Sequence, residues 1–444
     1  MGVVLIALFA LVAAACGEET DGGDGASATT AAAGGEETDG GDGASATTAA
    51  VGDDAATDGG NPLGETNPAQ GDPVVIGMIG TGADCAACTE GGRLEEPTAA
   101  ATVAWANEYL GGVGGHPIEL QVCNNDLDPS KAIDCANELI SSGAAAVVTG
   151  ADSTVTAWET LHGAGIPVIS YATAESSYTA DPDSTFVFQD SGALTVEYPI
   201  GLAEQLDTDA LSIFPVDLPA ATDIYAEDDT KARFEEAGLD LTVIPAPLGA
   251  VDMTPQAQQI VRDNPDGVVN IVGHDAFCIP GINALMDTGF TGTIGIISFC
   301  ATDAMREAFA GSDVFASIRL GASDTLGDAS DPSTQQYNAV LDEYASSDIA
   351  RDSSSASAMF SSFAGLAIGT AGIEGEVTPE SIIDALRSMD NEVLPGTGGR
   401  LFRCNGKASP SGPAVCSASG LSATLDAQGN PVSYEVFNDD PIPD

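Results

Sequence analysis

The sequence predicts an α/β protein with two lobes, each built around a parallel sheet. Two observations indicate this fold class: short apolar segments alternate with longer helix-like segments, and the alternation runs through two successive series. Such alternation is typical of a parallel sheet that is covered by helices on both faces. With 444 residues, of which 43% are hydrophobic, the chain is long enough for two ordinary domains and can bury a core in each.

The first series lies between residues 74 and 171. Apolar stretches such as VVIGMI, which starts at Val74, are expected to be strands, and stretches such as TAAATVAWANEYL, which ends at Leu110, are expected to be helices. In chain order we expect a strand at 74–79, a helix at 98–110, a strand at 117–123, a helix at 130–140, a strand at 144–150, a helix at 154–165 and a strand at 166–171.

The second series begins near residue 185 with TFVFQD and ALTVEYPIGLAEQL. It continues with a strand at 210–216, a long helix at about 224–237, a strand at 241–247, a helix after Thr254, a strand at 267–273, a helix from Pro280 and a strand at 292–298. Two series of this kind predict two sheets and therefore two lobes.

Residues 1–16, MGVVLIALFALVAAAC, are interpreted as an export signal. The apolar run is too short for a membrane-spanning helix, and small residues precede Cys16. The segment resembles the lipobox of bacterial lipoproteins, in which the cysteine carries the lipid and becomes the mature N-terminus. We therefore expect a lipoprotein signal peptide with Cys16 as the lipidation site; an uncleaved membrane anchor is the alternative.

Residues 17–72 are expected to be a disordered acidic tether. The run GEETDGGDGASATTAA occurs at 17–32 and again at 35–50. Gly, Ala, Thr and acidic residues without apolar periodicity cannot bury a core. Prolines from Pro62 to Pro73 mark the end of this segment.

The charge balance excludes one class of partner. The chain has 67 Asp and Glu against 12 Lys and Arg, which gives a formal net charge of -55. Nucleic acids are not expected as partners, because their phosphates need basic groups. Anionic lipid is repelled as well, so we expect membrane contact only through the lipid anchor.

The strand-to-helix loops are the candidate binding segments. Ligands of an open parallel sheet bind outside the carboxyl ends of the strands, where helix N-termini offer free N–H groups. These loops read GTGAD (80–84), GADST (150–154), SYATAES (170–176), VDLPAAT (216–222), GHDAFC (273–278) and SFCATD (298–303).

Three segments carry a family resemblance. They read NEYLGGVGGHPIELQV at 107–122, DLDPSKAIDCANELI at 126–140 and VDMTPQAQQIVRDNPDGVVNIVG at 251–273. They resemble, in the same order, segments of the type I periplasmic solute-binding proteins, the leucine/isoleucine/valine-binding group of branched-chain amino acid ABC transporter receptors. The resemblance extends from about Pro73 to the C-terminus.

The resemblance implies the type I periplasmic binding protein fold, with two Rossmann-like lobes joined by three hinge crossovers. By comparison with the family, the N-terminal lobe would hold 73–191 with 320–398, and the C-terminal lobe 192–319 with 399–444. The resemblance also implies a monomer without a cofactor that closes on a small molecule and presents it to an ABC permease. The expected location is the outer side of the cytoplasmic membrane, at the cell surface or in the periplasm.

The first-lobe contacts follow from the same resemblance. Family members commonly hold the carboxylate of an amino acid with N–H groups and hydroxyls of the loops that here read GADST and SYATAES. This assigns Ser153, Thr154 and Thr173 to the ligand, with Ala172 contributing its backbone. Because Ser is also a favoured helix cap, an N-cap role for Ser153 is the alternative. Asp152 would repel a carboxylate unless it points away or meets the ammonium of the ligand.

The second-lobe loops supply acceptors for the amino end of the ligand in this family. Asp217, Asp275 and Asp303 lie in these loops here, and caps or solvated turns are their alternative roles. His274 and Asp275 stand where family members often carry an aromatic residue. The expected ligand is therefore an amino acid or a related small amide or carboxylate.

Eight cysteines besides Cys16 predict disulfides in an exported chain. Cys123 and Cys135 flank one strand-to-helix turn, Cys278 and Cys300 follow two successive strands, Cys404 and Cys416 flank an expected hairpin, and Cys85 and Cys88 are left. A zinc site at the CAAC run is the alternative for the last two. Zinc sites of that type need a second ligand pair, and the chain has only three His, so we expect no metal.

An enzyme is the competing class of protein. His274, Asp275 and Cys278 could form a nucleophile with its base, but a disulfide to Cys300 would remove the thiol. No nucleophile elbow or phosphate-binding loop occurs in the sequence. We therefore expect a binding protein and not an enzyme. A receptor that signals without transport is a further alternative, which the sequence does not separate from uptake.

Overall fold

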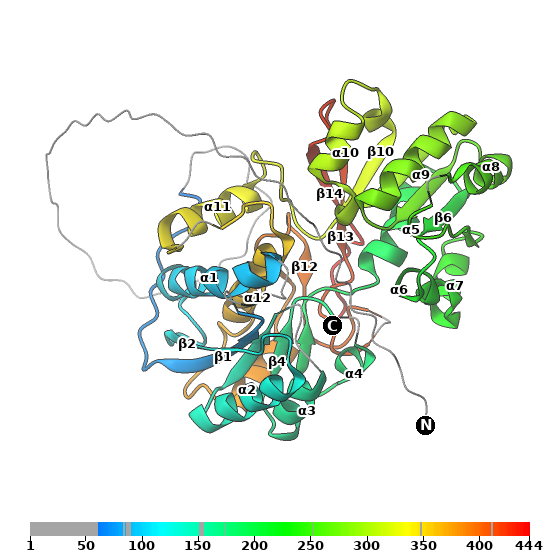
Figure 1. Cartoon of the computed structure of the whole chain (residues 1–444). Helices are drawn as coiled ribbons and strands as arrows, with labels where there is room; N and C mark the ends of the chain where they lie inside the picture. Colours follow the sequence, from blue (N-terminus) through cyan, green and yellow to red (C-terminus); the bar gives the residue numbers. More distant parts are fainter. Residues whose placement is uncertain are drawn as a thin grey trace, which may run out of the picture. The chain divides into compact units, whose positions relative to one another are not determined.

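The computed structural model describes residues 61–444 apart from 83–84, 86–89, 151–154, 174, 251, 347–348 and 410–411 (Figure 1). The expected signal peptide, Cys16 and most of the expected tether lie outside these residues. Residues 61–72, at the end of that tether, lie along the first helix, where the indole N–H of Trp105 donates to the main-chain oxygen of Leu63 at 2.9 Å. Within the described part of the chain, no helix is both long enough and apolar enough to cross a bilayer.

The first sheet has five parallel strands in the order β2-β1-β3-β4-β5. The strands are β1 (Val74–Gly80), β2 (Ile118–Asn124), β3 (Ala146–Thr149), β4 (Val168–Ser170) and β5 (Thr185–Val187). The helices between them are α1 (Glu90–Trp105), a π-helical turn (Ala106–Leu110), α2 (Pro129–Ser142), α3 (Val155–Gly163) and α4 (Ser176–Thr179). The strand near residue 185, with which we began the second series, is thus the last strand of the first sheet.

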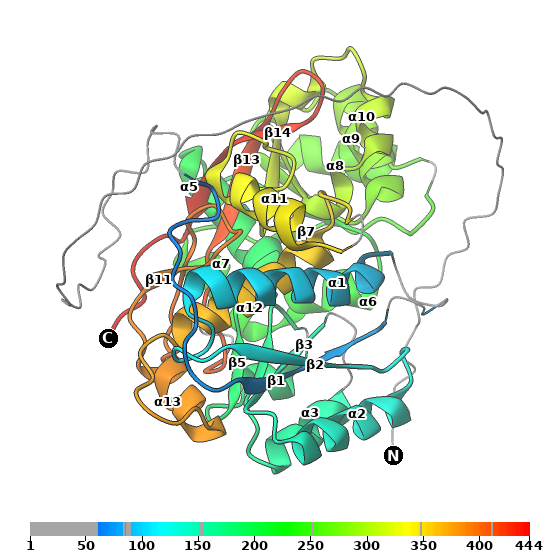
Figure 2. The same ribbon diagram turned by 90° about the vertical axis from the view of Figure 1, so that its left-hand side faces the viewer.

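Helices cover both faces of this sheet (Figure 2). Ile76 and Met78 of β1 pack in one cluster with α1 and with α12 (Ser354–Gly369), whereas Ile79 packs in another cluster with α2 and α3. Successive side chains of a strand point to opposite faces, so an apolar run such as VVIGMI suits a strand buried on both sides. The helices α11 (Pro332–Tyr344) and α13 (Pro379–Ser388) complete this part of the fold.

The second sheet has seven strands in the order β14-β13-β10-β9-β8-β6-β7. The strands are β6 (Leu211–Pro215), β7 (Thr242–Val243), β8 (Val268–Val272), β9 (Thr293–Ile297), β10 (Ile318–Ala322), β13 (Gly420–Leu425) and β14 (Pro431–Phe437). The helices are α5 (Tyr198–Gln205), α6 (Pro219–Thr222), α7 (Asp228–Glu236), α8 (Thr254–Asp263), α9 (Asp275–Thr288) and α10 (Asp303–Ala308). β13 runs antiparallel to β10 and β14, and the other pairs are parallel. The predicted α/β class with largely parallel sheets is confirmed.

Three expected helices differ from the sequence prediction. The helix expected at 98–110 already begins at Glu90, with Pro97 inside α1, and it ends in a π-helical turn. The helix expected at 224–237 is broken, because Glu227 is extended between a 3-10 turn (Asp223–Ala226) and α7. Asp228 and Asp229 then lie in the first turn of α7, where the helix dipole stabilises acidic side chains. The helix expected from Pro280 begins five residues earlier, at Asp275, so the proline stands inside α9.

The chain passes between the two sheets at three places within the described residues. The first crossover is 188–192, after β5, and the second is 323–331, after β10. The third is 417–419, because β12 (Leu401–Phe402) still pairs with β11 (Glu392–Val393) and Val415 still bridges Val187 of β5. The lobe boundaries given by the family resemblance stay a prediction.

Three of the cysteine pairs that the spacing predicts form disulfides. They are Cys123–Cys135, Cys278–Cys300 and Cys404–Cys416. Cys85 also forms a disulfide, which removes it as a zinc ligand, and Cys88 lies outside the described residues. The bridge between Cys278 and Cys300 ties the first turn of α9, after β8, to the 3-10 turn (Ser298–Cys300) after β9, at the edge where the predicted second-lobe site lies.

Candidate functional site

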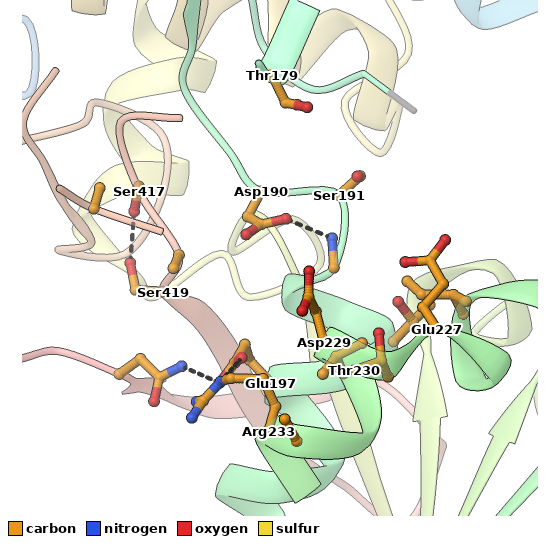
Figure 3. A pocket seen from close by; sticks show the side chains of 18 of the residues that line it. Thr179, Asp190, Ser191, Glu197, Glu227, Asp229, Thr230, Arg233, Ser417 and Ser419 are labelled. Atoms are coloured by element: carbon orange, nitrogen blue, oxygen red, sulfur yellow. Dashed lines mark hydrogen bonds and ion pairs between the residues drawn. The ribbon is translucent and has the colours of Figure 1, made fainter. Parts of the chain in front are cut away.

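A cavity of about 970 Å³ lies between elements of the two sheets (Figure 3). Thr173 and Ser176, which follow β4, line it from the first sheet. Residues of α7 and its approach, within 227–236, line it from the second sheet. Its remaining walls come from the first crossover and the turn after it, from residues within 221–224 and 401–408, from the third crossover and from the C-terminal residues after β14. A solute in this cavity would therefore contact parts of both sheets.

Acidic side chains outnumber basic ones in the lining of this cavity. The carboxylates are Asp190, Glu197, Asp223, Glu227, Asp229, Glu236 and Asp440. Arg233 and Lys407 are the cations among the described lining residues. Arg233 pairs with Glu197 and Glu236, and Lys407 donates to the main-chain oxygen of Asp444. The negative charge of the wall is thus only partly neutralised, and it favours a ligand that carries positive charge.

Glu197 fixes one wall of the cavity through a charge-assisted network (Figure 3). Nε and Nη2 of Arg233 donate to the two carboxylate oxygens of Glu197 at 2.9 and 2.7 Å. The side-chain amide of Asn438 donates to the same carboxylate at 3.1 Å. The hydrogen bond to Glu197 raises the pKa of the Arg233 guanidinium. This fork joins α7, the turn after the first crossover and the C-terminal segment, so it shapes the cavity.

A second cavity, of about 90 Å³, lies at the carboxyl ends of β3 and β4. Gly150, Ser170 and Ala172 line it from the two strand ends, Glu95 lines it from α1, and Met359 lines it from α12. Because Ala172 lines this cavity and the next residue lines the larger one, the loop after β4 lies between the two.

The structure brings part of the predicted first-lobe site together. Ala172 lines the smaller cavity and Thr173 the larger one, with the Thr173 hydroxyl accepting from the N–H of Glu175 at 3.1 Å. Ser153 and Thr154, and Asp152 beside them, lie outside the described residues. The binding roles of Ser153 and Thr154 stay predictions.

The predicted second-lobe residues lie at one edge of the second sheet. Asp217, His274 and Asp303 follow β6, β8 and β9, which are neighbours in the sheet, and Asp275 opens α9 directly after His274. Asp217 is exposed, and Arg306 donates to the Asp303 carboxylate at 2.6 Å. Of the described residues that line either cavity, none is Asp217, His274 or Asp303. Their ligand roles also stay predictions.

Arg400 joins the three crossovers at one buried point. Its side chain has no exposed surface. Nη1 donates to Oε1 of Gln189 in the first crossover at 3.1 Å, and to the main-chain oxygen of Ser323 in the second at 2.9 Å. Nε donates to the hydroxyl of Ser419 in the third at 3.4 Å. One guanidinium therefore holds all three segments that must bend if the lobes move.

The same guanidinium reaches the loop after β4. Its Nη1 donates to the Tyr171 hydroxyl at 3.3 Å, and that hydroxyl donates to the Ser323 oxygen at 2.9 Å. Asp324 is buried beside them, and burial raises the pKa of its carboxyl to about 6 against the lowering effect of the Leu326 N–H and of Arg400. Burial also raises the pKa of the Tyr171 phenol. The hinge and the predicted ligand loop thus share one polar network.

The C-terminal residues return from the second sheet toward the first. β14 ends in the second sheet at Phe437, but Ile442 makes two hydrogen bonds of 2.9 Å with the side chain of Asn391, which precedes β11. Arg403 donates to the Asp444 carboxylate at 2.7 Å. Residues 438–444 therefore form an additional link between the parts of the chain that carry the two sheets.

Three features of the site were not found from the sequence. They are Glu95, Arg400 and the C-terminal segment 438–444. Glu95 could have been noticed, because it shares a helix face with Ala99 and Thr102 by helical spacing and is an acid among buried positions. The sequence carries no local signal for Arg400 or the C-terminal segment, because their partners are distant in the chain.

Comparisons with known proteins agree with the geometry. Residues 73–414 match a family profile described as periplasmic binding protein. A search of curated protein sequences finds no match. Many solved structures share the fold.

Three of these structures illustrate the range of relatives. A putative branched-chain amino acid ABC transporter protein from Rhodospirillum rubrum has a TM-score of 0.64 and 17% identity, over 82% of this chain and 99% of its own. The branched-chain amino acid transporter substrate-binding protein of Streptococcus pneumoniae, solved with isoleucine, has a TM-score of 0.53 and 16% identity, over 82% and 99%. A solute-binding protein of an ABC transporter from R. palustris, solved with 4-hydroxybenzoate, has a TM-score of 0.57 and 18% identity, over 83% and 98%.

Proposed function

The chain belongs to the periplasmic binding protein family, and from this membership we propose that it is the extracytoplasmic solute-binding lipoprotein of an ABC uptake system. The family consists of solute-binding proteins and receptors, not of enzymes. The two lobes would close on one small solute and present it to the permease.

The observation that carries this proposal is the large cavity. It is lined from the first sheet by Thr173 and from the second by α7, and the first and third crossovers contribute to its wall. Its volume of about 970 Å³ is at the upper end of the usual range for ligand pockets, about 300–1,000 Å³, as expected of a cleft that narrows on closure. A solute that contacts both walls favours the closed state by its differential affinity.

The proposed ligand is an amino acid or a related small amide or carboxylate. The acidic lining favours members of this class that carry an ammonium group. Ser153, Thr154, Ala172 and Thr173 are the proposed first-lobe contacts. Asp217, His274, Asp275 and Asp303 are the proposed second-lobe contacts, which would reach the solute when the lobes close.

Attachment to the membrane is proposed through lipid on Cys16. Residues 17–60 would then act as a spacer that holds the folded part away from the membrane surface. The net charge of -55 gives the protein no electrostatic attraction to that surface. The protein would work as a monomer without a cofactor.

A thermal-shift screen of the purified chain tests the proposal. Amino acids, polyamines, amides, urea and short carboxylates are added in turn, and each stabilising solute is followed by calorimetry. We expect at least one amino acid or amide to raise the melting temperature, because a solute that binds only the folded state stabilises it. Turnover of a solute, or stabilisation by none of them, would contradict the proposal.

A further inference from the structure

Glu95 places a buried carboxylate in the smaller cavity. Its side chain is only 1% exposed, which is rare for a Glu. It lines the cavity together with Gly150, Ser170 and Ala172, from the ends of β3 and β4. No Lys or Arg is among the described residues that line this cavity.

The glycine at position 150 makes room for this carboxylate. A Cβ added at Gly150 would lie 2.1 Å from Oε2 of Glu95, so no side chain is compatible with the present position of the carboxylate. A Cβ added at Gly80 would lie 3.5 Å from the same oxygen. The carboxylate therefore sits between the carboxyl ends of β1 and β3.

This position is the topological switch point of the first sheet. In the order β2-β1-β3-β4-β5, the connection after β1 leads to β2 on one side, and the connection after β2 leads back past β1 to β3 on the other. Open parallel sheets bind ligands in the crevice at such a point, outside the carboxyl ends of the strands. Glu95 thus stands where the fold itself favours a ligand, one loop away from the large cavity.

The charge of Glu95 determines which ligand group suits this position. A buried carboxylate is costly unless hydrogen bonds or a cation compensate it, and a second anion beside it is repelled. A carboxylate offers about four lone-pair positions, so hydrogen bonds within the protein and one to a ligand are compatible. A cavity of about 90 Å³ fits a single head group.

We propose that Glu95 binds the positively charged head group of the ligand, an ammonium, amidinium or guanidinium, and that the solute is an organic cation or an amino acid with a cationic side chain. The proposal rests on the proposed function, since it names the solute class of the same cleft. The head group enters the smaller cavity, and the rest of the solute lies in the acidic larger cavity. A free carboxylate of the solute is directed away from Glu95, so Ala172 then borders the cationic head group and not the carboxylate that the family resemblance assigns to it.

Calorimetry with the purified full chain tests this assignment through isosteric probe pairs. Arginine is compared with citrulline, and choline with 3,3-dimethylbutanol, because each pair differs mainly in charge. We expect a charged member to bind about 100-fold more tightly than its neutral isostere, as is usual for a desolvated charge pair. Isoleucine and 4-hydroxybenzoate are included as probes without a cationic side chain.

The variant Glu95→Gln should weaken binding of the charged probe about 100-fold while leaving that of its neutral isostere within about twofold. Glu96→Gln is the matched control: Glu96 is the next residue of α1, its carboxylate accepts from Asn124 at 3.0 Å, and it is not among the described residues that line either cavity. This control should bind the charged probe like the wild type. If Glu95→Gln does not fold, the probe pairs on the wild type still decide the question.

The outcomes separate this proposal from the proposed function. If isoleucine or 4-hydroxybenzoate binds more tightly than either cation, or if citrulline binds as tightly as arginine, solute binding stands and the assignment of Glu95 is overturned. Unchanged affinity of a folded Glu95→Gln variant for the charged probe overturns it as well. If none of the six probes binds while the thermal-shift screen finds another solute without a positive charge, the assignment of Glu95 is overturned and solute binding stands.

Discussion

Replacing Arg400 with methionine should lower the free energy of unfolding by about 3–5 kcal/mol, because a buried charge with several partners leaves them unsatisfied when it is removed. Methionine keeps much of the volume but cannot donate to Oε1 of Gln189 or to the Ser323 oxygen, which Arg400 reaches at 3.1 and 2.9 Å. It also releases the hydroxyl of Ser419 in the third crossover. Urea unfolding followed by circular dichroism measures the change.

Arg262→Met is the control for this prediction. Arg262 lies on the surface, where its side chain is 67% exposed and bonds the neighbouring Asp263. Its loss should change the unfolding free energy by less than about 0.5 kcal/mol, as for most exposed pairs. An Arg400→Met protein within about 1 kcal/mol of the wild type would show that the three crossovers do not depend on this guanidinium.

Asp324 should make the stability of the hinge depend on pH. Burial raises the pKa of its carboxyl to about 6 in the folded protein, above the value of about 3.9 expected in the unfolded chain. The folded state therefore binds the proton more strongly. The stabilising contribution of the protonated form is complete below about pH 4 and is lost as the pH rises through about 6.

Asp324→Asn, which is neutral at every pH, reveals this contribution. We expect the free energy of unfolding of the variant to rise by about 2–3 kcal/mol relative to that of the wild type as the pH goes from about 4 to 7.5. One unit of pKa shift corresponds to about 1.4 kcal/mol. Urea unfolding of both proteins across this range measures the difference. A difference that stays constant across the range, or one that falls as the pH rises, would contradict the assignment.

Local patterns predicted most of the sheet architecture. The apolar runs at β1, β3, β6 and β8 are buried strands, as expected, because their length and lack of alternation suit parallel strands covered on both faces. Glu227 interrupts the long helix expected from Ile224, because a propensity argument does not include the favourable placement of Asp228 and Asp229 at a new helix start.

Within the candidate site, the sequence predicted only residues that directly follow strands. Ala172 and Thr173 follow β4 and do line cavities, since the carboxyl ends of parallel strands meet at one edge. Arg400 could not be predicted, because Gln189 is 211 residues away in the chain and the contact exists only after both sheets have formed. The C-terminal link between Ile442 and Asn391 could not be predicted for the same reason, because the two partners are 51 residues apart in the chain.

The central claim is that the two lobes close on one solute. It is tested most directly by pulsed electron resonance between spin labels on α2 and α9, at the exposed positions Asp134 and Asp287. The spin labels are attached through unnatural amino acids and not through added cysteines, so the disulfides stay intact. With the solute that most raises the melting temperature, the account predicts that the distance distribution shortens and narrows, and that Arg400→Met broadens it. A bound solute that leaves the distribution unchanged would contradict closure around the ligand.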